Sequence, residues 1–162
     1  MTTIKYVKGD ATAPKEEGRK ILIHCCNDCV PGKWGSGFVL AISRRWSEPK
    51  SQYVKWSRGK TDGPLYELGN VQFVKVEEDL VIGNMLGQKG VKKSAGAPPI
   101  RYSAIRKCLK RVAMAAKKNN ACVCCPKFGA DRAGGSWDKI EEIIIETLCE
   151  EDIEVTVYEL GG

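Results

Sequence analysis

The sequence feature that most constrains the fold is an uncharged run at residues 21–26, which leads directly into a glycine-rich segment. The run reads Ile-Leu-Ile-His-Cys-Cys and lacks the alternation of apolar and polar residues typical of a half-exposed strand. Continuous apolar runs of this length indicate a central strand that is covered on both faces. The glycines lie between residues 31 and 37, and residues 38–46 then place apolar side chains at helical spacing. This order of strand, glycine-rich loop and helix predicts an α/β fold.

The rest of the chain continues the same pattern. Further strands are expected at residues 4–8, 70–76, 80–82, 122–125 and 153–158, and further helices at 50–57, 102–118 and 137–148. The helix at 102–118 has the clearest apolar stripe. Residues 83–99 are expected to form a long loop, and long loops in compact domains are often functional. The element order predicts a mixed sheet with helices on both faces.

Length and composition indicate one soluble domain over residues 1–162, with 43% apolar and 28% charged residues. No apolar run approaches the roughly 18–20 residues that span a bilayer, so no membrane partner is expected. The first residues also lack the apolar core of a signal peptide. We therefore expect a cytoplasmic protein.

The net charge is +6, from 26 basic and 20 acidic residues. This excess is consistent with an anionic partner or with an ordinary solvated surface. Nucleic-acid binding remains open, but the linear sequence shows no basic stripe with interleaved aromatic residues. It also shows no zinc-finger or homeodomain pattern.

Eight cysteines include two C-x-x-C spacings, at residues 26–29 and 122–125, with His24 close to the first. A zinc site is one interpretation. However, residues 122–125 are expected to form a strand, on which positions three apart point to opposite faces. Buried free thiols are the better interpretation, and we expect neither a metal nor a cofactor.

Two glycine-rich loops carry the strongest functional signal, at residues 35–37 and 129–135. Each follows a predicted strand and precedes a predicted helix. Backbone N–H groups and the positive end of a helix together favour a phosphate or diphosphate. Neither loop matches a P-loop or G-x-G-x-x-G, so Walker-type nucleotide hydrolysis is disfavoured. Ordinary turns are the alternative for each loop alone.

Three side chains near these loops have both a functional and a structural interpretation. His24, the only histidine, is either a site residue or a satisfied histidine at a strand end. Asp10 either accepts a hydrogen bond from a ligand amine or caps a turn. Trp34 either covers a ligand or packs against the following helix.

The chain resembles the macro domain family. The resemblance rests on residues 6–10, 21–24 with Asn27, 34–37, 126–129 and 133–137, and 156–158, in that order along nearly the whole chain. It is most similar to fungal ADP-ribose 1''-phosphate phosphatases and terminal ADP-ribose protein glycohydrolases. The resemblance implies a monomeric three-layer α/β/α domain with about six strands, which binds ADP-ribose at the carboxyl ends of the strands.

Residue roles follow from that resemblance. Asp10 would hold the adenine amine, Tyr158 would flank the adenine, and His24 and Asn27 would lie near the distal ribose. The ligand-binding residues implied are Asp10, Ala11, Asn27, Trp34, Gly35, Ser36, Gly37, Phe38, Asn84, Phe128, Gly129, Ala130, Asp131, Arg132, Ala133, Gly134 and Tyr158.

The resemblance favours a phosphatase that converts ADP-ribose 1''-phosphate to ADP-ribose. The glycohydrolase branch has a lysine where this chain has residues 83–85, Gly-Asn-Met, which argues against a lysyl intermediate. His24 and Asp131 are the acid–base candidates near the loops. The alternatives are an ADP-ribosyl hydrolase acting on modified protein or nucleic acid, and a reader that binds ADP-ribose without turnover.

Overall fold

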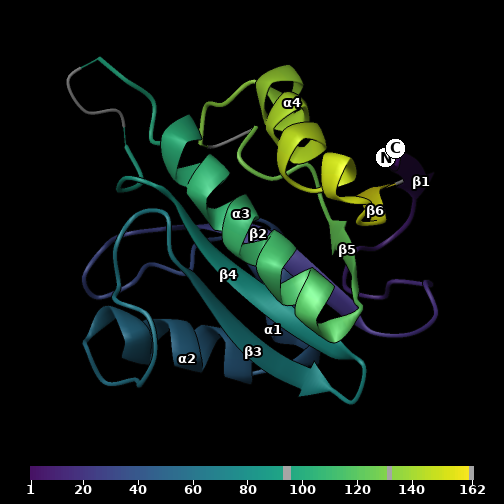
Figure 1. Cartoon of the computed structure of the whole chain (residues 1–162). Coiled ribbons are helices and arrows are strands. Elements are labelled where there is room, and N and C mark those ends of the chain that lie inside the picture. The colour runs from purple at the N-terminus through teal and green to yellow at the C-terminus, as the bar shows by residue number, and fades with distance from the viewer. Residues whose placement is uncertain (93–95, 131–132, 161–162) are drawn as a thin grey trace.

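The computed structural model describes residues 1–92, 96–130 and 133–160 (Figure 1). Six strands are formed: β1 (Lys5–Lys8), β2 (Lys20–Asn27), β3 (Val71–Glu77), β4 (Leu80–Gln88), β5 (Cys122–Cys125) and β6 (Val155–Glu159). The helices are α1 (Phe38–Arg45), α2 (Glu48–Ser57), α3 (Tyr102–Asn119) and α4 (Trp137–Thr147), with a short 3₁₀ turn at Cys149–Glu151.

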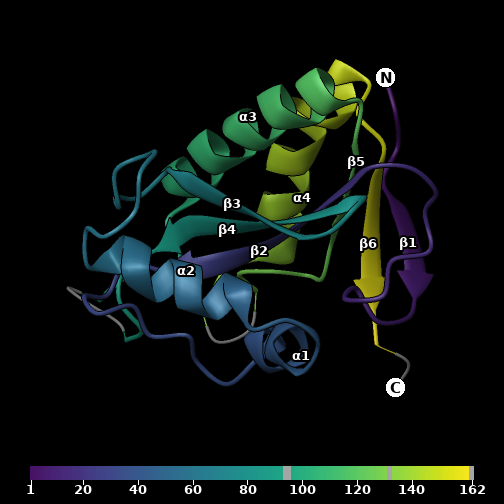
Figure 2. The ribbon, with the colours of Figure 1, turned by 90° about the horizontal axis from the view of Figure 1, so that it is seen from below.

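The six strands form one sheet in the order β1-β6-β5-β2-β4-β3. All neighbouring pairs are parallel except β3 and β4, which form an antiparallel hairpin. Helices α3 and α4 cover one face of the sheet, and α1 and α2 cover the other (Figures 1 and 2). The predicted three-layer α/β/α architecture with a mixed six-stranded sheet is confirmed.

Strand β4 is longer than the sequence pattern predicts. Residues 83–88, expected to begin a loop, continue the strand, because Gly83 pairs with Ile23 of β2 on one side and Phe73 of β3 on the other. A Cβ at Gly83 would lie 3.1 Å from the Ile23 side chain, which explains a residue of low strand propensity at this place. The connection after β4 therefore starts at residue 89.

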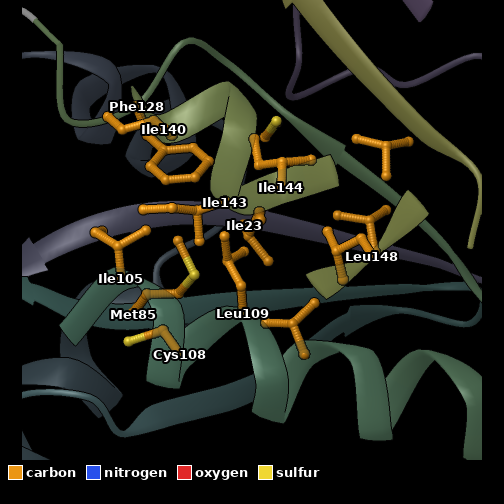
Figure 3. Close-up of a cluster of buried hydrophobic side chains, with 14 of the residues drawn as sticks. Ile23, Met85, Ile105, Cys108, Leu109, Phe128, Ile140, Ile143, Ile144 and Leu148 are labelled. Carbon is orange, nitrogen blue, oxygen red and sulfur yellow. The ribbon is translucent and has the colours of Figure 1, made fainter. Parts of the chain in front are cut away.

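Two apolar clusters hold the three layers together. The larger one lies between the sheet and helices α3 and α4 and includes Ile23, Met85, Leu109 and Ile144 (Figure 3). The second lies beneath α1 and α2 and includes Leu22, Ile42 and Trp56. Both faces of β2 are thus covered, as its uncharged sequence indicates.

All eight cysteines are free thiols, and all except Cys29 belong to one of the two clusters. Cys26, Cys108, Cys124, Cys125 and Cys149 are buried, and the other three are half-buried. Burial raises the pKa of Cys25 to about 12, so this thiol stays protonated at neutral pH. Within the described ranges, no three His, Cys, Asp or Glu side chains are placed to hold a metal ion. None of the helices in those ranges is long and apolar enough to cross a bilayer.

Candidate ligand-binding site

The two glycine-rich loops leave the same edge of the sheet. Strands β2 and β5 are adjacent and parallel, with Leu22 opposite Cys124 in the register. The loop after β2 leads into α1, and the loop after β5 leads into α4. Ligands of open α/β sheets bind outside the carboxyl ends of the strands, so this edge is the candidate site.

The predicted site residues divide into two layers by exposure. Eight are at least partly exposed at this edge: Asp10, Gly35, Ser36, Gly37, Phe38, Gly129, Ala130 and Gly134. Eight are buried, with less than a tenth of their surface exposed: Ala11, His24, Asn27, Trp34, Asn84, Phe128, Ala133 and Tyr158. Asp131 and Arg132 lie outside the described residues. The first group can contact a ligand directly, whereas the second is placed to support it.

Asn27 organises the first loop from the end of β2. Its Nδ2 donates to the carbonyl of Lys33 at 2.6 Å, and its Oδ1 accepts from the backbone of Cys29 at 3.1 Å. The hydroxyl of Tyr53 on α2 also donates to Oδ1, at 2.9 Å. These bonds fold residues 28–33 back over the strand end, so Asn27 fixes the loop; its direct contact with a ligand stays a prediction.

The first loop ends at an open helix N-terminus. Gly35 has a φ of +88°, a conformation that favours glycine, and it turns the chain into the N-cap residue Gly37. No side chain caps α1, and its first turn holds no acidic residue. The positive end of the helix dipole therefore faces this edge without a competing carboxylate, as an anion site requires.

The second loop is shaped by close packing. Gly129 and Gly134 have φ values of +76° and +74°. The backbone N–H of Gly135 donates to the carbonyl of Gly129 at 2.9 Å, and Ile100 donates to the carbonyl of Ala133 at 3.0 Å. A Cβ at Gly135 would overlap the Gly129 carbonyl, so this turn is built for glycine. Ser136 occupies the N-cap of α4, but its side chain makes no capping bond.

The surroundings of Asp10 are compatible with both roles considered from the sequence, a turn cap and an acceptor for a ligand amine. Its Oδ1 accepts hydrogen bonds from the Thr12 backbone at 2.8 Å and the Thr12 hydroxyl at 2.7 Å, which is a turn cap. Its Oδ2 lies 3.6 Å from the Arg45 guanidinium, and 43% of the side chain is exposed. Burial opposes ionisation, but the Thr12 hydrogen bonds and the Arg45 charge outweigh it, so the pKa of Asp10 is lowered. The carboxylate is therefore ionised, and its side chain is partly exposed.

Arg45 is a site residue that the sequence pattern did not reveal. It lies on the last turn of α1, and its Nε donates to the Thr12 hydroxyl at 2.9 Å. This bond ties α1 to the turn that carries Asp10. No local motif signals it, because the partners are 33 residues apart.

His24 belongs to a buried polar network. The Asn84 amide donates to the carbonyl of Pro49 at 3.2 Å and to Gln72 Oε1 at 3.0 Å. A carbonyl only accepts, so this orientation places Asn84 Oδ1 toward His24 Nε2, 2.6 Å away. His24 therefore donates from Nε2, which makes it the neutral tautomer with a proton on that nitrogen.

The other face of the His24 ring is also enclosed. Nδ1 lies 3.9 Å from the Cys26 thiol, and the Trp34 ring packs edge-on at 5.4 Å between centroids. Burial lowers the pKa of His24 to about 4, although the Asn84 hydrogen bond opposes this shift. At neutral pH this histidine is uncharged. Its predicted catalytic role is untested, and its 2% exposure fits a structural role better.

Trp34 and Tyr158 support the edge from below. The Trp34 indole donates to the Val39 carbonyl at 3.2 Å and to Ser43 Oγ at 2.8 Å, so the ring packs against α1 and does not form an exposed lid. The Tyr158 hydroxyl donates to the Glu16 carboxylate and accepts from the Lys15 backbone at 3.0 Å. Tyr158 is 6% exposed, and its predicted contact with an adenine is untested.

Solved structures resemble this chain over nearly its full length. A macrodomain protein from Streptomyces coelicolor shares 44% identity over 98% of this chain and 99% of its own, with a TM-score of 0.84. A protein of unknown function from Bacteroides thetaiotaomicron shares 47% identity over 97% and 98%, with a TM-score of 0.91. The chain belongs to the macrodomain family.

Other comparisons are more distant or cover less. No family model matches the chain. The zebrafish Chromodomain-helicase-DNA-binding protein 1-like is 30% identical over 97% of this chain, which spans 16% of that protein. The yeast ADP-ribose 1''-phosphate phosphatase is 40% identical over 55 residues, 34% of this chain and 29% of that protein. Thermosipho africanus DarTG, solved in complex with ADP-ribose, is 15% identical over 98% of this chain and 42% of its own, with a TM-score of 0.77; it shows the fold alone.

Proposed function

We propose that this chain binds ADP-ribose at the carboxyl edge of its sheet and hydrolyses the phosphomonoester of ADP-ribose 1''-phosphate. The observation that carries the binding proposal is the convergence of two glycine-bearing loops with an ionised carboxylate. The loops follow the adjacent strands β2 and β5, and Asp10 follows β1. Backbone donors for a diphosphate and an acceptor for an amine are thus supplied at one edge.

Each part of the ligand has a proposed partner. The partly exposed carboxylate of Asp10 accepts a hydrogen bond from the adenine amine. The backbone N–H groups of residues 35–38 and 129–130, with the start of α1, hold the diphosphate. The buried residues beneath, Asn27 and Trp34 among them, keep the loops in shape before the ligand arrives. Such preorganisation reduces the entropic cost of binding.

Two observations favour phosphomonoester hydrolysis over other activities. One is the 55-residue similarity to the yeast ADP-ribose 1''-phosphate phosphatase. The other is that residues 83–85, where the glycohydrolase branch has its lysine, lie inside β4 and are fully covered by protein. A lysyl intermediate has no side chain to form on at this position.

The chemistry needs a water nucleophile, a group that orients it or takes its proton, and donors for the phosphoryl charge. Loop amides at the start of α1 supply the donors. The Nε2 of His24 is already hydrogen-bonded to Asn84. We therefore propose that His24 holds the end of β2 and the first loop in place, and that it transfers no proton. Asp131, the other acid–base candidate, lies outside the described residues, and its role remains a prediction.

The test is to incubate the protein separately with ADP-ribose 1''-phosphate, ADP-ribosylated protein and ADP-ribosylated DNA. We expect release of inorganic phosphate and formation of ADP-ribose from the first substrate, with little change in the other two. Release of ADP-ribose from the modified protein or DNA, without phosphate release, would instead indicate an ADP-ribosyl hydrolase. Tight binding of ADP-ribose with no turnover of any substrate would indicate a reader.

A further inference from the structure

Helix α3 accounts for the whole excess of positive charge. It contains six of the 26 basic residues and none of the 20 acidic ones, so the other residues carry equal numbers of each sign. The six are Arg106, Lys107, Lys110, Arg111, Lys117 and Lys118. At 100° per residue they occupy an arc of about 140° on a helix about 27 Å long. Met114 lies within this arc and is 73% exposed.

The side of this arc that faces α4 is neutralised. Arg106 forms an ion pair with Glu146, and Lys117 forms one with Glu151 at 2.9 Å. These carboxylates would repel a polyanion, so this flank is a poor docking surface. A hollow of about 390 Å³ lies here, lined by both pairs and by Lys110.

The opposite side of the arc faces β3 and keeps its charge. The aliphatic part of Lys107 packs against Gly69, just before β3, and the Nε of Arg111 donates to the Gly69 carbonyl at 3.1 Å. In the part of the chain that the structure describes, Lys107, Lys110, Arg111 and Lys118 form no ion pair with a carboxylate. Lys110 lines the hollow beside both ion pairs, so three cations, Lys107, Arg111 and Lys118, stay available along the β3 flank.

An aromatic ring lies on the same layer. β3 is one of the two edge strands of the sheet, and α3 contacts it. The ribbon views show α3 running along the β3–β4 side of the sheet (Figures 1 and 2). Phe73 is two residues after Val71, so both side chains point to the same face of the sheet. Val71 packs into the cluster beneath α3, and Phe73 therefore points to the α3 side. Its side chain is 40% exposed. Lys75, two residues on, pairs only loosely with the exposed Glu78, at 3.8 Å.

We propose that the α3–β3 surface, formed by Lys107, Arg111, Lys118 and Phe73, binds single-stranded nucleic acid. Phosphates would lie along the lysine and arginine side chains, and a base would stack on the Phe73 ring. Proteins bind single-stranded nucleic acid through a row of cations that contact the phosphates and through exposed aromatic rings on which the bases stack. Stacking tolerates any sequence, because every base has a flat face. An acidic peptide would use the cations but would have no use for the ring.

This surface is not visible as a stripe in the linear sequence. Phe73 and Lys107 are more than thirty positions apart, and only the packing of α3 beside β3 brings them to one layer. The absence of a basic stripe from the linear sequence therefore does not bear on this surface.

The experiment measures the fluorescence anisotropy of a labelled oligothymidylate titrated with the protein at several salt concentrations. With three phosphates neutralised, the slope of log K against log salt should be about −2. Replacing Lys107, Arg111 and Lys118 together by alanine removes all three cations, so it should weaken binding at least tenfold and reduce the slope by about 2. Phe73→Ala should weaken binding by roughly fivefold or more at unchanged slope.

A charge-matched control variant distinguishes binding at the α3–β3 surface from general attraction by the net positive charge. Lys5, Lys8 and Lys15 lie on or after β1, at the opposite edge of the sheet from β3, and are exposed. Replacing these three by alanine removes the same charge and should leave binding nearly unchanged. Thermal unfolding of every variant checks that the fold is retained. ADP-ribose is absent from the assay, so its result does not depend on the proposed enzymatic function.

Three outcomes would overturn the proposal. The first is absence of binding at low salt. The second is an equal loss in the two triple variants, which would indicate general charge attraction. The third is competition by polyglutamate as effective as that by unlabelled oligothymidylate, combined with no effect of Phe73→Ala; that would indicate an acidic peptide surface.

Discussion

When the pH is lowered from about 6.5 to 4, the free energy of unfolding of the wild-type protein should fall by roughly 3 kcal/mol more than that of a His24→Gln variant. Burial lowers the pKa of His24 to about 4, against an ordinary value of 6.5. The unfolded chain therefore takes up a proton near pH 6.5, while the folded chain resists it until about pH 4. This contribution is present above pH 6.5 and is lost as the pH falls through that window.

Urea unfolding of both proteins near pH 7 and near pH 4.5 measures the difference. Glutamine keeps a donor for Asn84 without a titrating ring, so the variant controls for carboxylates that also protonate in acid. Because His24 is the only histidine, its imidazole NMR signals can be followed in the wild type without a variant. A midpoint near 6.5 would contradict the buried network.

The same variant tests the role of His24 in turnover. If His24 only supports the first loop and transfers no proton, His24→Gln should keep the turnover of ADP-ribose 1''-phosphate within about tenfold of the wild type. A loss of roughly 10²-fold or more, with ADP-ribose affinity unchanged, would return proton transfer to His24.

Gly135→Ala should weaken ADP-ribose binding by roughly ten- to a hundredfold, because overpacking typically costs about 1–3 kcal/mol. The new Cβ would overlap the Gly129 carbonyl, which accepts the Gly135 N–H that closes the second loop. The backbone must open there, and the amides at Gly129 and Ala130 lose their direction. Calorimetric titration of the variant with ADP-ribose measures the effect.

Gly18→Ala is the control for a glycine replacement. Gly18 has a φ of +80°, and a Cβ there would meet nothing within 4 Å. This variant should lose some stability from backbone strain but keep the wild-type affinity. If Gly135→Ala also kept that affinity, the second loop would not hold the ligand.

Most of the fold could be predicted because the apolar pattern is locally unambiguous. The α3 stripe and the uncharged β2 run each define an element without reference to the rest of the chain. The end of β4 could not be predicted, since Gly83 and Asn84 have low strand propensity. They stay in the strand because β2 and β3 pair with it on both sides.

The candidate site was predicted less evenly. Loop positions follow from glycine content and strand order, so residues 35–37 and 129–130 lie after the adjacent strands β2 and β5, as expected. The exposure of a side chain depends on how the chain packs in three dimensions. Nothing in the local sequence around His24 or Trp34 indicates that other residues bury these side chains. Arg45 shows the same limit, because its contact with the Asp10 turn depends on how α1 lies across the sheet.

The central claim is that the carboxyl edge holds ADP-ribose through loop amides and Asp10. Calorimetric titration with ADP-ribose and, separately, with AMP tests it most directly. Because AMP lacks the diphosphate and distal ribose, we expect much tighter binding of ADP-ribose. A charge-assisted hydrogen bond contributes about 1.5–3 kcal/mol, so Asp10→Ala should weaken ADP-ribose binding tenfold or more with the fold retained. Equal affinity for the two ligands, or no binding of ADP-ribose, would contradict the claim.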